Sequence, residues 1–119
     1  MRIPYDEMVS VFVEKLEKYG IKGDDAQLSA RLFADASRDG IHTHGLQRFP
    51  KFIDSIKKGA VDVDKRAVYR ESLGIIERWD GQRGPGNLNA WICNKRAIEL
   101  AKEYGVGVVA LSNTNHWMR

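Results

Sequence analysis

The chain has 119 residues, of which 43% are apolar and 29% are charged, and its formal net charge is +3. These values are typical of a small globular domain with a core, and they exclude a disordered chain. The excess of positive charge is small and does not alternate with aromatic residues, so we expect no nucleic-acid partner. No apolar run approaches the roughly 18 residues of a membrane helix, so we expect no membrane span and a cytoplasmic location.

Three helices are predicted in the first half of the chain. Apolar residues recur at spacings of three and four between residues 5 and 19, and a second such stripe ends at Gly40. A polar loop is expected at residues 41–45. The third helix is expected to begin near Leu46 or Gln47 and to end at a glycine, Gly59.

Pro50 limits where the third helix can begin. Proline has no backbone N–H, and a helix tolerates it in the first turn, where N–H groups have no partner within the helix. With a start at Leu46 or Gln47, Arg48 lies in the first turn. His44 then lies in the loop directly before the helix.

A hairpin, a long helix and a buried strand are predicted in the second half. Residues 67–71 and 75–79 have the pattern of two strands joined by a short turn. A helix over residues 87–104 precedes a continuous apolar run at 106–111, which indicates a buried strand. The polar loop at 112–119 follows that strand, a position that commonly holds active-site residues in α/β proteins.

This order of elements predicts a mixed α/β fold in two parts. Residues 1–64 form an N-terminal helical segment that carries a histidine loop, and residues 65–119 form the start of an α/β domain. A buried strand normally has neighbours on both edges. We therefore expect more of that domain to lie outside these residues.

Histidine and arginine are the residues that suggest chemistry. His42, His44 and His116 all lie in polar loops; His44 precedes Gly45, which allows a ligand to approach closely, and Arg48 follows one helical turn later. Ketone reduction delivers a hydride to the carbonyl carbon and a proton to its oxygen. A histidine, with an ordinary pKa of about 6.5, can donate that proton. An arginine binds a carboxylate with two hydrogen bonds, so a 2-keto acid would use both residues.

A metal site is the alternative for the same histidines. His42 and His44 have the spacing of a metal-binding pair, and His116 and Asp39 could complete the ligands of a metal-dependent hydrolase. The pair lies in a loop rather than on a strand. We therefore favour the reading without a metal.

The glycines at residues 81, 84 and 86 suggest a dinucleotide-binding loop, but their spacing differs from the usual fingerprint. Asn89 stands where the last glycine is needed, and Pro85 removes one backbone N–H. We therefore interpret this segment as a structural turn.

The tryptophans and the single cysteine have simpler interpretations. Trp79 and Trp91 are expected to pack in the core, and Cys93 is expected to be a buried thiol in the long helix. Trp117 adjoins His116, and it either lines a site or is only solvated.

Several segments resemble the malate/L-lactate dehydrogenase family of non-Rossmann, NAD(P)-dependent oxidoreductases. Residues 41–50 read IHTHGLQRFP, which is similar to the family segment G-[IV]-x-[ST]-H-G-x-x-R-x-P. Parts of residues 73–88 resemble the family's hairpin and the turn that follows it. Parts of residues 96–111 resemble the family's next helix and strand. Residues 113–119 read NTNHWMR, in which Asn-His is family-wide and the Trp-Met-Arg at 117–119 resembles the diketogulonate-reducing branch.

The resemblance implies a homodimeric enzyme that reduces a 2-keto sugar acid, 2,3-diketo-L-gulonate, to 3-keto-L-gulonate in carbohydrate catabolism, with NADH or NADPH as cofactor. It implies that His44 donates a proton to the keto oxygen and that Arg48 binds the substrate carboxylate. Thr43, which keeps the hydroxyl of the more common serine, is expected in the substrate site. Asn115 and His116 are implied as further residues of the pocket, with His116 among the catalytic ones.

Length is the main departure from the family. Its members are longer, and their nicotinamide-binding segments lie downstream of the segments matched here. We therefore expect a cofactor site mostly outside these residues, and an inactive chain when they stand alone. Two alternatives stay open: an inactive remnant or interaction module of the family, or a dehydrogenase of the malate, lactate or ureidoglycolate type.

Overall fold

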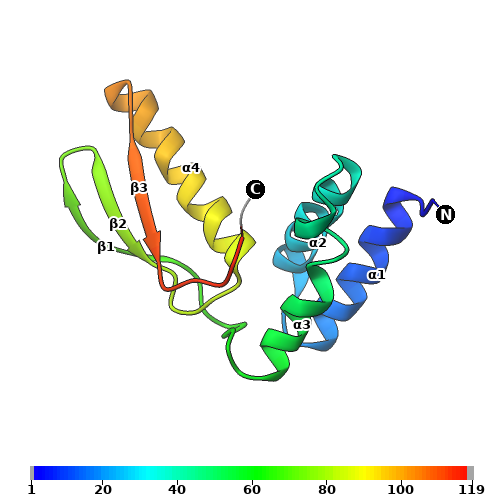
Figure 1. Cartoon of the computed structure of the whole chain (residues 1–119). Coiled ribbons are helices and arrows are strands. Elements are labelled where there is room, and N and C mark those ends of the chain that lie inside the picture. Colours follow the sequence, from blue (N-terminus) through cyan, green and yellow to red (C-terminus); the bar gives the residue numbers. More distant parts are fainter. Residues whose placement is uncertain (1, 118–119) are drawn as a thin grey trace. The chain divides into compact units, whose positions relative to one another are not determined.

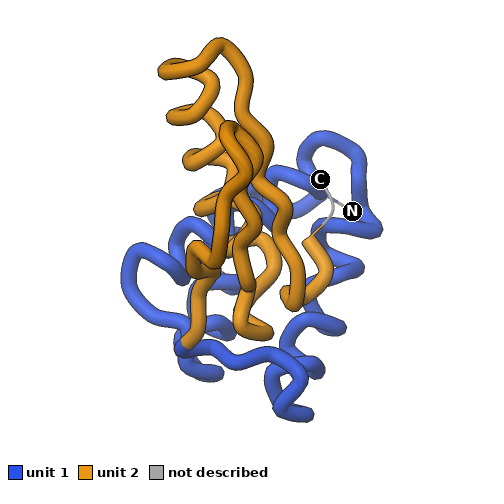
Figure 2. Tube along the Cα trace, turned by 90° about the vertical axis from the view of Figure 1, so that its left-hand side faces the viewer, with its two compact units in different colours: residues 1–64, 118–119 blue, residues 65–117 orange. Residues whose placement is uncertain are grey.

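A computed structural model describes residues 2–117 of the chain. These residues form two compact units (Figure 2). We call residues 2–64 the helical unit and residues 65–117 the sheet unit. The mixed α/β fold expected from the sequence is confirmed.

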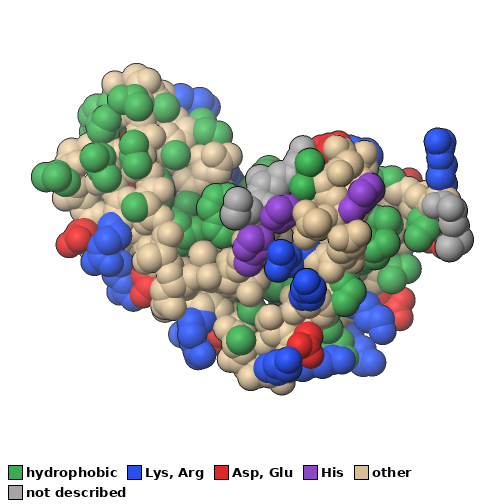
Figure 3. All heavy atoms as spheres, viewed as in Figure 1, with side chains coloured by type: hydrophobic (Ala, Val, Ile, Leu, Met, Phe, Trp, Pro, Cys, Tyr) green, Lys and Arg blue, Asp and Glu red, His purple; other side chains and the backbone are tan. Residues whose placement is uncertain are grey.

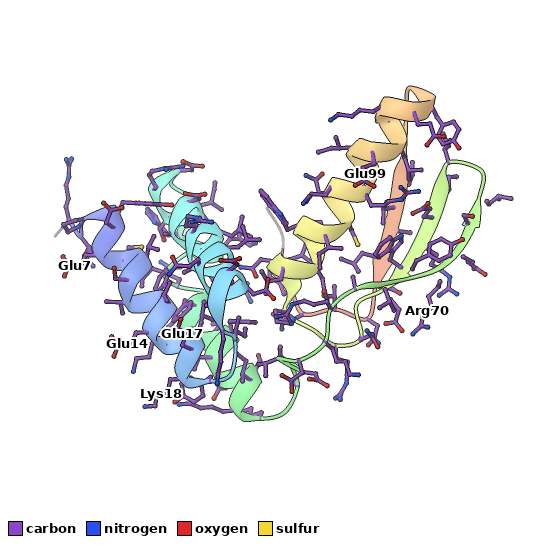
Figure 4. The ribbon with its side chains drawn as sticks, turned by 180° about the vertical axis from the view of Figure 1, so that it is seen from behind. Glu7, Glu14, Glu17, Lys18, Arg70 and Glu99 are labelled. Carbon is purple, nitrogen blue, oxygen red and sulfur yellow. The ribbon has the colours of Figure 1, made fainter. Side chains whose placement is uncertain are left out.

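The helical unit contains the helices α1 (Tyr5–Lys18), α2 (Gly23–Arg38) and α3 (Phe49–Lys57), together with a 3₁₀ helix, η1 (His42–His44). Helices α1 and α2 lie side by side (Figure 1). On α1, Glu7 and Glu14 point away from the other helices (Figure 4), as expected for the polar side of an amphipathic helix.

Phenylalanine rings form the centre of the helical unit. The rings of Phe12 and Phe49 are stacked, with centroids 4.1 Å apart. Phe33 meets Phe49 edge to face at 5.2 Å and Phe52 at 5.4 Å. All four residues are buried, so α1, α2 and α3 share one aromatic core.

The predicted start of the third helix is wrong. Helix α3 begins at Phe49, and Arg48 is its N-cap residue rather than part of its first turn. The amides of Arg48 and Phe49 both donate to the carbonyl of Gly45, so the chain first makes a separate turn there. Pro50 does lie in the first turn, as predicted, and the expected histidine loop contains the 3₁₀ helix.

The sheet unit contains a three-stranded sheet and one helix. Strands β1 (Val68–Leu73) and β2 (Ile76–Asp80) form the predicted hairpin, and β3 (Val108–Ser112) pairs in parallel with β2. Helix α4 (Gly86–Tyr104) connects β2 to β3 and packs along β3 (Figure 1). This strand–helix–strand crossover is the usual connection between parallel strands.

Burial in the sheet unit differs from two predictions. Strand β3 is not buried, since its side chains alternate between exposed and half-buried, and Trp91 on α4 is 43% exposed. Within the described residues, β3 pairs only with β2 and lies at the edge of the sheet, which explains its exposure. Figure 3 shows hydrophobic side chains on the surface of this unit. Cys93 is buried as predicted, and Trp79 is half-buried.

An ion pair between a buried carboxylate and a half-buried guanidinium joins the sheet to its helix. Glu77 on β2 is 6% exposed and accepts two hydrogen bonds from the Arg96 guanidinium on α4, at 2.9 and 2.8 Å. The indole N–H of Trp79 donates to the same carboxylate at 3.0 Å. Arg96, followed by Trp79, holds the pKa of Glu77 below its ordinary value. Glu99, labelled in Figure 4, also accepts a bond from Arg96.

We predict that Glu77→Gln lowers the free energy of unfolding by about 2 kcal/mol, because Arg96 loses the buried carboxylate with which it pairs and keeps only the exposed Glu99. Urea unfolding followed by tryptophan fluorescence measures this loss. The control is Glu71→Gln, which removes the exposed pair between Glu71 and Arg78 and should cost less than about 0.5 kcal/mol. Equal losses in the two variants would contradict the claim that the pair of Glu77 and Arg96 stabilises the sheet unit more than an exposed ion pair does.

Candidate functional site

The turn that carries His44 is fixed to the end of α2 by its backbone. The amide of Ile41 donates to the carbonyl of Ala36 at 2.8 Å, and the amide of His44 donates to the carbonyl of Ile41 at 3.0 Å. The carbonyl of His42 then accepts bonds from Gly45 and Gln47. This network holds η1 as a compact turn between α2 and α3.

Gly45 lets this turn lie directly against α2. A Cβ atom at Gly45 would come within 2.6 Å of the backbone nitrogen of Ser37 and would also overlap its side chain. The Ser37 hydroxyl accepts a hydrogen bond from the amide of Leu46 at 2.7 Å. A glycine is therefore required next to His44 for steric reasons in addition to any approach by a ligand.

The structure brings together three of the predicted site residues in the helical unit. Thr43 Oγ1 lies 3.2 Å from Nδ1 of His44, and Nε of Arg48 donates to the backbone carbonyl of Thr43 at 3.3 Å. His44 and Arg48 are half-buried, whereas His42 is exposed. The bond to Thr43 uses one of the five N–H donors of a guanidinium group.

The aromatic core determines where Arg48 lies. Phe49 follows Arg48 directly, is 6% exposed and stacks on Phe12. Because the backbone of Phe49 is fixed by this packing, the N-cap position occupied by Arg48 is fixed as well. The arrangement can present an imidazole and a guanidinium, a proton donor and an anion-binding group, from one short segment.

The other predicted site residues follow β3 in the sheet unit. Asn113 has a left-handed backbone (φ 53°), which asparagine tolerates better than most residues, and its side chain donates to Asp80 at 2.9 Å. The amide of Asn115 donates to the carbonyl of Gly84 at 3.3 Å. His116 and Trp117 are exposed, and residues 118–119 of the predicted motif lie outside the described residues.

Asn89 is a buried polar residue to which sequence reasoning assigned no role. Its relative exposure is 0%, and its side chain bonds to Ala67, Gly81 and Thr114. The one signal in the sequence is an asparagine within the first turns of a helix, directly after the glycine-rich segment. That segment has the structural role we predicted, since a Cβ at Gly84 would meet the carbonyl of Lys65.

The described residues do not fit a dinucleotide at the glycine-rich segment. The space next to Gly86, where a phosphate would approach, is filled by the carbonyls of Asn115 and His116. Carbonyl oxygens repel a phosphate, and Pro85 has no N–H to offer it. The surroundings of Gly86 and Pro85 therefore do not fit the phosphates of a nicotinamide nucleotide.

Among residues 2–117, no three His, Cys, Asp or Glu side chains gather as a metal-binding group, and Asp39 pairs with Arg38 at 3.3 Å. The metal alternative for His42 and His44 thus gains no support. In the same part of the chain, none of the helices combines the length and apolar character needed to cross a membrane.

Comparison with known proteins gives one consistent result. The family model for malate/L-lactate dehydrogenase matches residues 3–119. A 2,3-diketo-L-gulonate reductase from Salmonella heidelberg is 42% identical over all 119 residues, which are 36% of that protein. The chain therefore spans about a third of the length of the curated relatives it matches.

Solved structures show the same fold. A malate dehydrogenase from Pyrococcus horikoshii OT3 has a TM-score of 0.92 and 31% identity, with 98% of this chain and 34% of that chain covered. A putative malate/lactate dehydrogenase from E. coli has a TM-score of 0.94 and 26% identity, with coverage of 100% and 33%.

The hydrogen bonds between Asp80 and the loop after β3 are predicted to depend on pH. The amide of Gln82, the side chain of Asn113 and the guanidinium of Arg70 lower the pKa of Asp80 from 3.8 to about 2. Because the folded value is the lower one, these bonds contribute fully above about pH 4 and are lost as the pH falls toward 2. Carboxyl ¹³C NMR of Asp80 should give a midpoint near pH 2.

Arg70, labelled on β1 in Figure 4, provides the matched variant for this titration. Arg70→Gln should raise the midpoint of Asp80, and Arg78→Gln on the neighbouring strand should leave it unchanged. A midpoint of 3.8 in the unaltered chain would show that these bonds do not form.

Proposed function

Because the chain belongs to the malate/L-lactate dehydrogenase family, we propose that it acts in the interconversion of a 2-keto acid and its 2-hydroxy acid. The observation that supports this most is the cluster of Thr43, His44 and Arg48. It combines a proton donor with a carboxylate-binding group on one turn. The relatives named as malate dehydrogenase and diketogulonate reductase support the same class of reaction.

In this proposal the cluster donates the proton that the keto oxygen needs and binds the carboxylate of the substrate. Reduction adds a hydride to the keto carbon, while His44 gives a proton to the keto oxygen, which becomes a hydroxyl group. With the Thr43 hydroxyl as donor to Nδ1, the ring carries a proton on Nε2, which we assign to the proton transfer. Arg48 binds the substrate carboxylate with the guanidinium N–H groups that do not bond to Thr43.

Asn115 and His116 are proposed as further site residues. Both follow the carboxyl end of β3, and the amide of Asn115 is tied to Gly84. Such loops hold binding and catalytic groups in many α/β proteins. We assign Asn115 to substrate binding and His116 to a second catalytic position.

2,3-diketo-L-gulonate is the proposed substrate, since a reductase of that name is 42% identical over the whole chain. Its reduction product is 3-keto-L-gulonate, within carbohydrate catabolism. The competing substrates are malate, lactate and ureidoglycolate, which carry the same carboxylate next to a hydroxyl or keto carbon. Steady-state rates with each compound decide among them.

The hydride donor and the assembly are also proposals. We assign NADH, with NADPH as the alternative, and place its site mostly outside these residues because the glycine-rich segment does not fit it. A homodimer and a cytoplasmic location are proposed for the whole protein. Titration of the 119-residue chain with NADH, followed by tryptophan quenching, should show no saturable binding, and micromolar binding would contradict this placement.

We predict that His44→Gln lowers kcat by about 10²–10⁴-fold in the whole protein that carries these residues, because the keto oxygen loses its proton donor. Loss of NADH absorbance with 2,3-diketo-L-gulonate measures the rate. His42→Gln is the matched control, since His42 is exposed on the same 3₁₀ helix, and its kcat should be unchanged. A similar loss in both variants would count against the role of His44.

We predict that Arg48→Lys raises KM for the keto acid by about 10–100-fold, because a lysine cannot make the two parallel bonds of a guanidinium group. Initial rates over a range of keto acid concentrations separate KM from kcat. Arg31→Lys on the exposed side of α2 should leave both constants unchanged. An unaltered KM in Arg48→Lys would contradict the proposal that Arg48 binds the substrate carboxylate.

A further inference from the structure

We propose that Asn89 is a positioning residue, whose buried side-chain amide holds Thr114 and thereby the Asn115–His116 segment in the geometry that the reaction needs. The inference rests on the proposed function, since that function gives Asn115 and His116 their roles. Asn89 lies on α4, and the segment it would position follows β3.

The side chain of Asn89 joins three separate segments of the sheet unit. Its Oδ1 accepts a bond from the amide of Ala67 at 2.7 Å. Its Nδ2 donates to the carbonyl of Gly81 and to Oγ1 of Thr114, both at 2.9 Å. Asn89 has a relative exposure of 0%, so its bonds are made in the interior of the sheet unit.

Few side chains can replace this amide. The site requires one acceptor and two donors on a short side chain, and among short side chains only asparagine supplies both. Aspartate would keep the bond from Ala67 but would offer no donor to Gly81 or Thr114. Glutamine adds a methylene where the packing leaves no room. The residue is therefore matched to its three partners.

Thr114 transmits this constraint to the proposed site. It lies between Asn113, which is held by Asp80, and Asn115, whose amide bonds to Gly84. The Thr114 hydroxyl accepts the bond from Asn89 Nδ2 at 2.9 Å and also donates to the carbonyl of Gly84 at 3.5 Å, so the shorter of its two links runs to Asn89. Loss of that bond should loosen Asn115 and His116.

The test uses the ¹⁵N,¹³C-labelled 119-residue chain and the variants Thr114→Val, Thr114→Ser and Asn89→Asp. Valine has the shape of threonine without the hydroxyl, and serine restores the hydroxyl. We expect Thr114→Val to speed hydrogen exchange of the Asn115 amide about tenfold and to shift the imidazole resonances of His116. Thr114→Ser should reverse both effects.

Kinetics in the whole protein complete the test. Thr114→Val should lower kcat about tenfold with little change in KM, and Thr114→Ser should restore it. Unchanged exchange and unchanged His116 resonances in Thr114→Val would overturn the proposal, and so would a normal kcat despite altered resonances. If Asn89→Asp does not fold, the two Thr114 variants still decide whether the bond at Thr114 holds Asn115 and His116. If the unaltered protein reduces no 2-keto acid, the proposed function fails, while the resonances alone decide whether Asn89 holds the loop.

Discussion

Close approach of backbone at two glycines is the constraint on which both histidine-bearing segments depend. At Gly45 the turn with His44 lies against Ser37, where a Cβ would be 2.6 Å from a backbone nitrogen. At Gly86 the start of α4 lies against the segment with His116, where a Cβ would be 2.6 Å from its carbonyl oxygen. Any larger residue would push these segments away, so the position of each histidine is set by a glycine.

Polar groups then fix what the glycines allow. In the helical unit, the Ser37 hydroxyl and the carbonyl of Thr43 hold the backbone and the Arg48 side chain. In the sheet unit, Asp80 and the buried Asn89 hold the segment after β3. Both segments thus combine tight packing with specific hydrogen bonds, which is the arrangement expected where side chains must be held for chemistry.

Periodicity and glycine positions predicted most of the fold. The three helices of the first half, the hairpin and the crossover helix all follow from spacing and stop signals. The burial of β3 and Trp91 was predicted wrongly because an apolar pattern marks a surface that can be covered and does not show whether a neighbour covers it. The predicted start of α3 was wrong because the chain forms a separate turn at Gly45 where the first turn of the helix was expected.

The contacts among the predicted site residues differ from those that the sequence suggested. His44 and Arg48 were expected to meet through one turn of helix, whereas the structure joins them through the Gly45 turn and the carbonyl of Thr43. Their selection among several polar residues came from the family resemblance, since spacing alone also allowed a metal site. Asn89 was not predicted, because its role depends on three partners that are distant along the chain.

The most direct test of the central claim is an NMR titration of the labelled chain with 2,3-diketo-L-gulonate in the absence of any cofactor. Saturable shifts of the His44 imidazole and of the Arg48 Nε–H resonance would show that this turn binds the keto acid. The same titration with an uncharged sugar should leave both resonances in place. A folded chain whose His44 and Arg48 resonances do not respond to the keto acid would contradict the account.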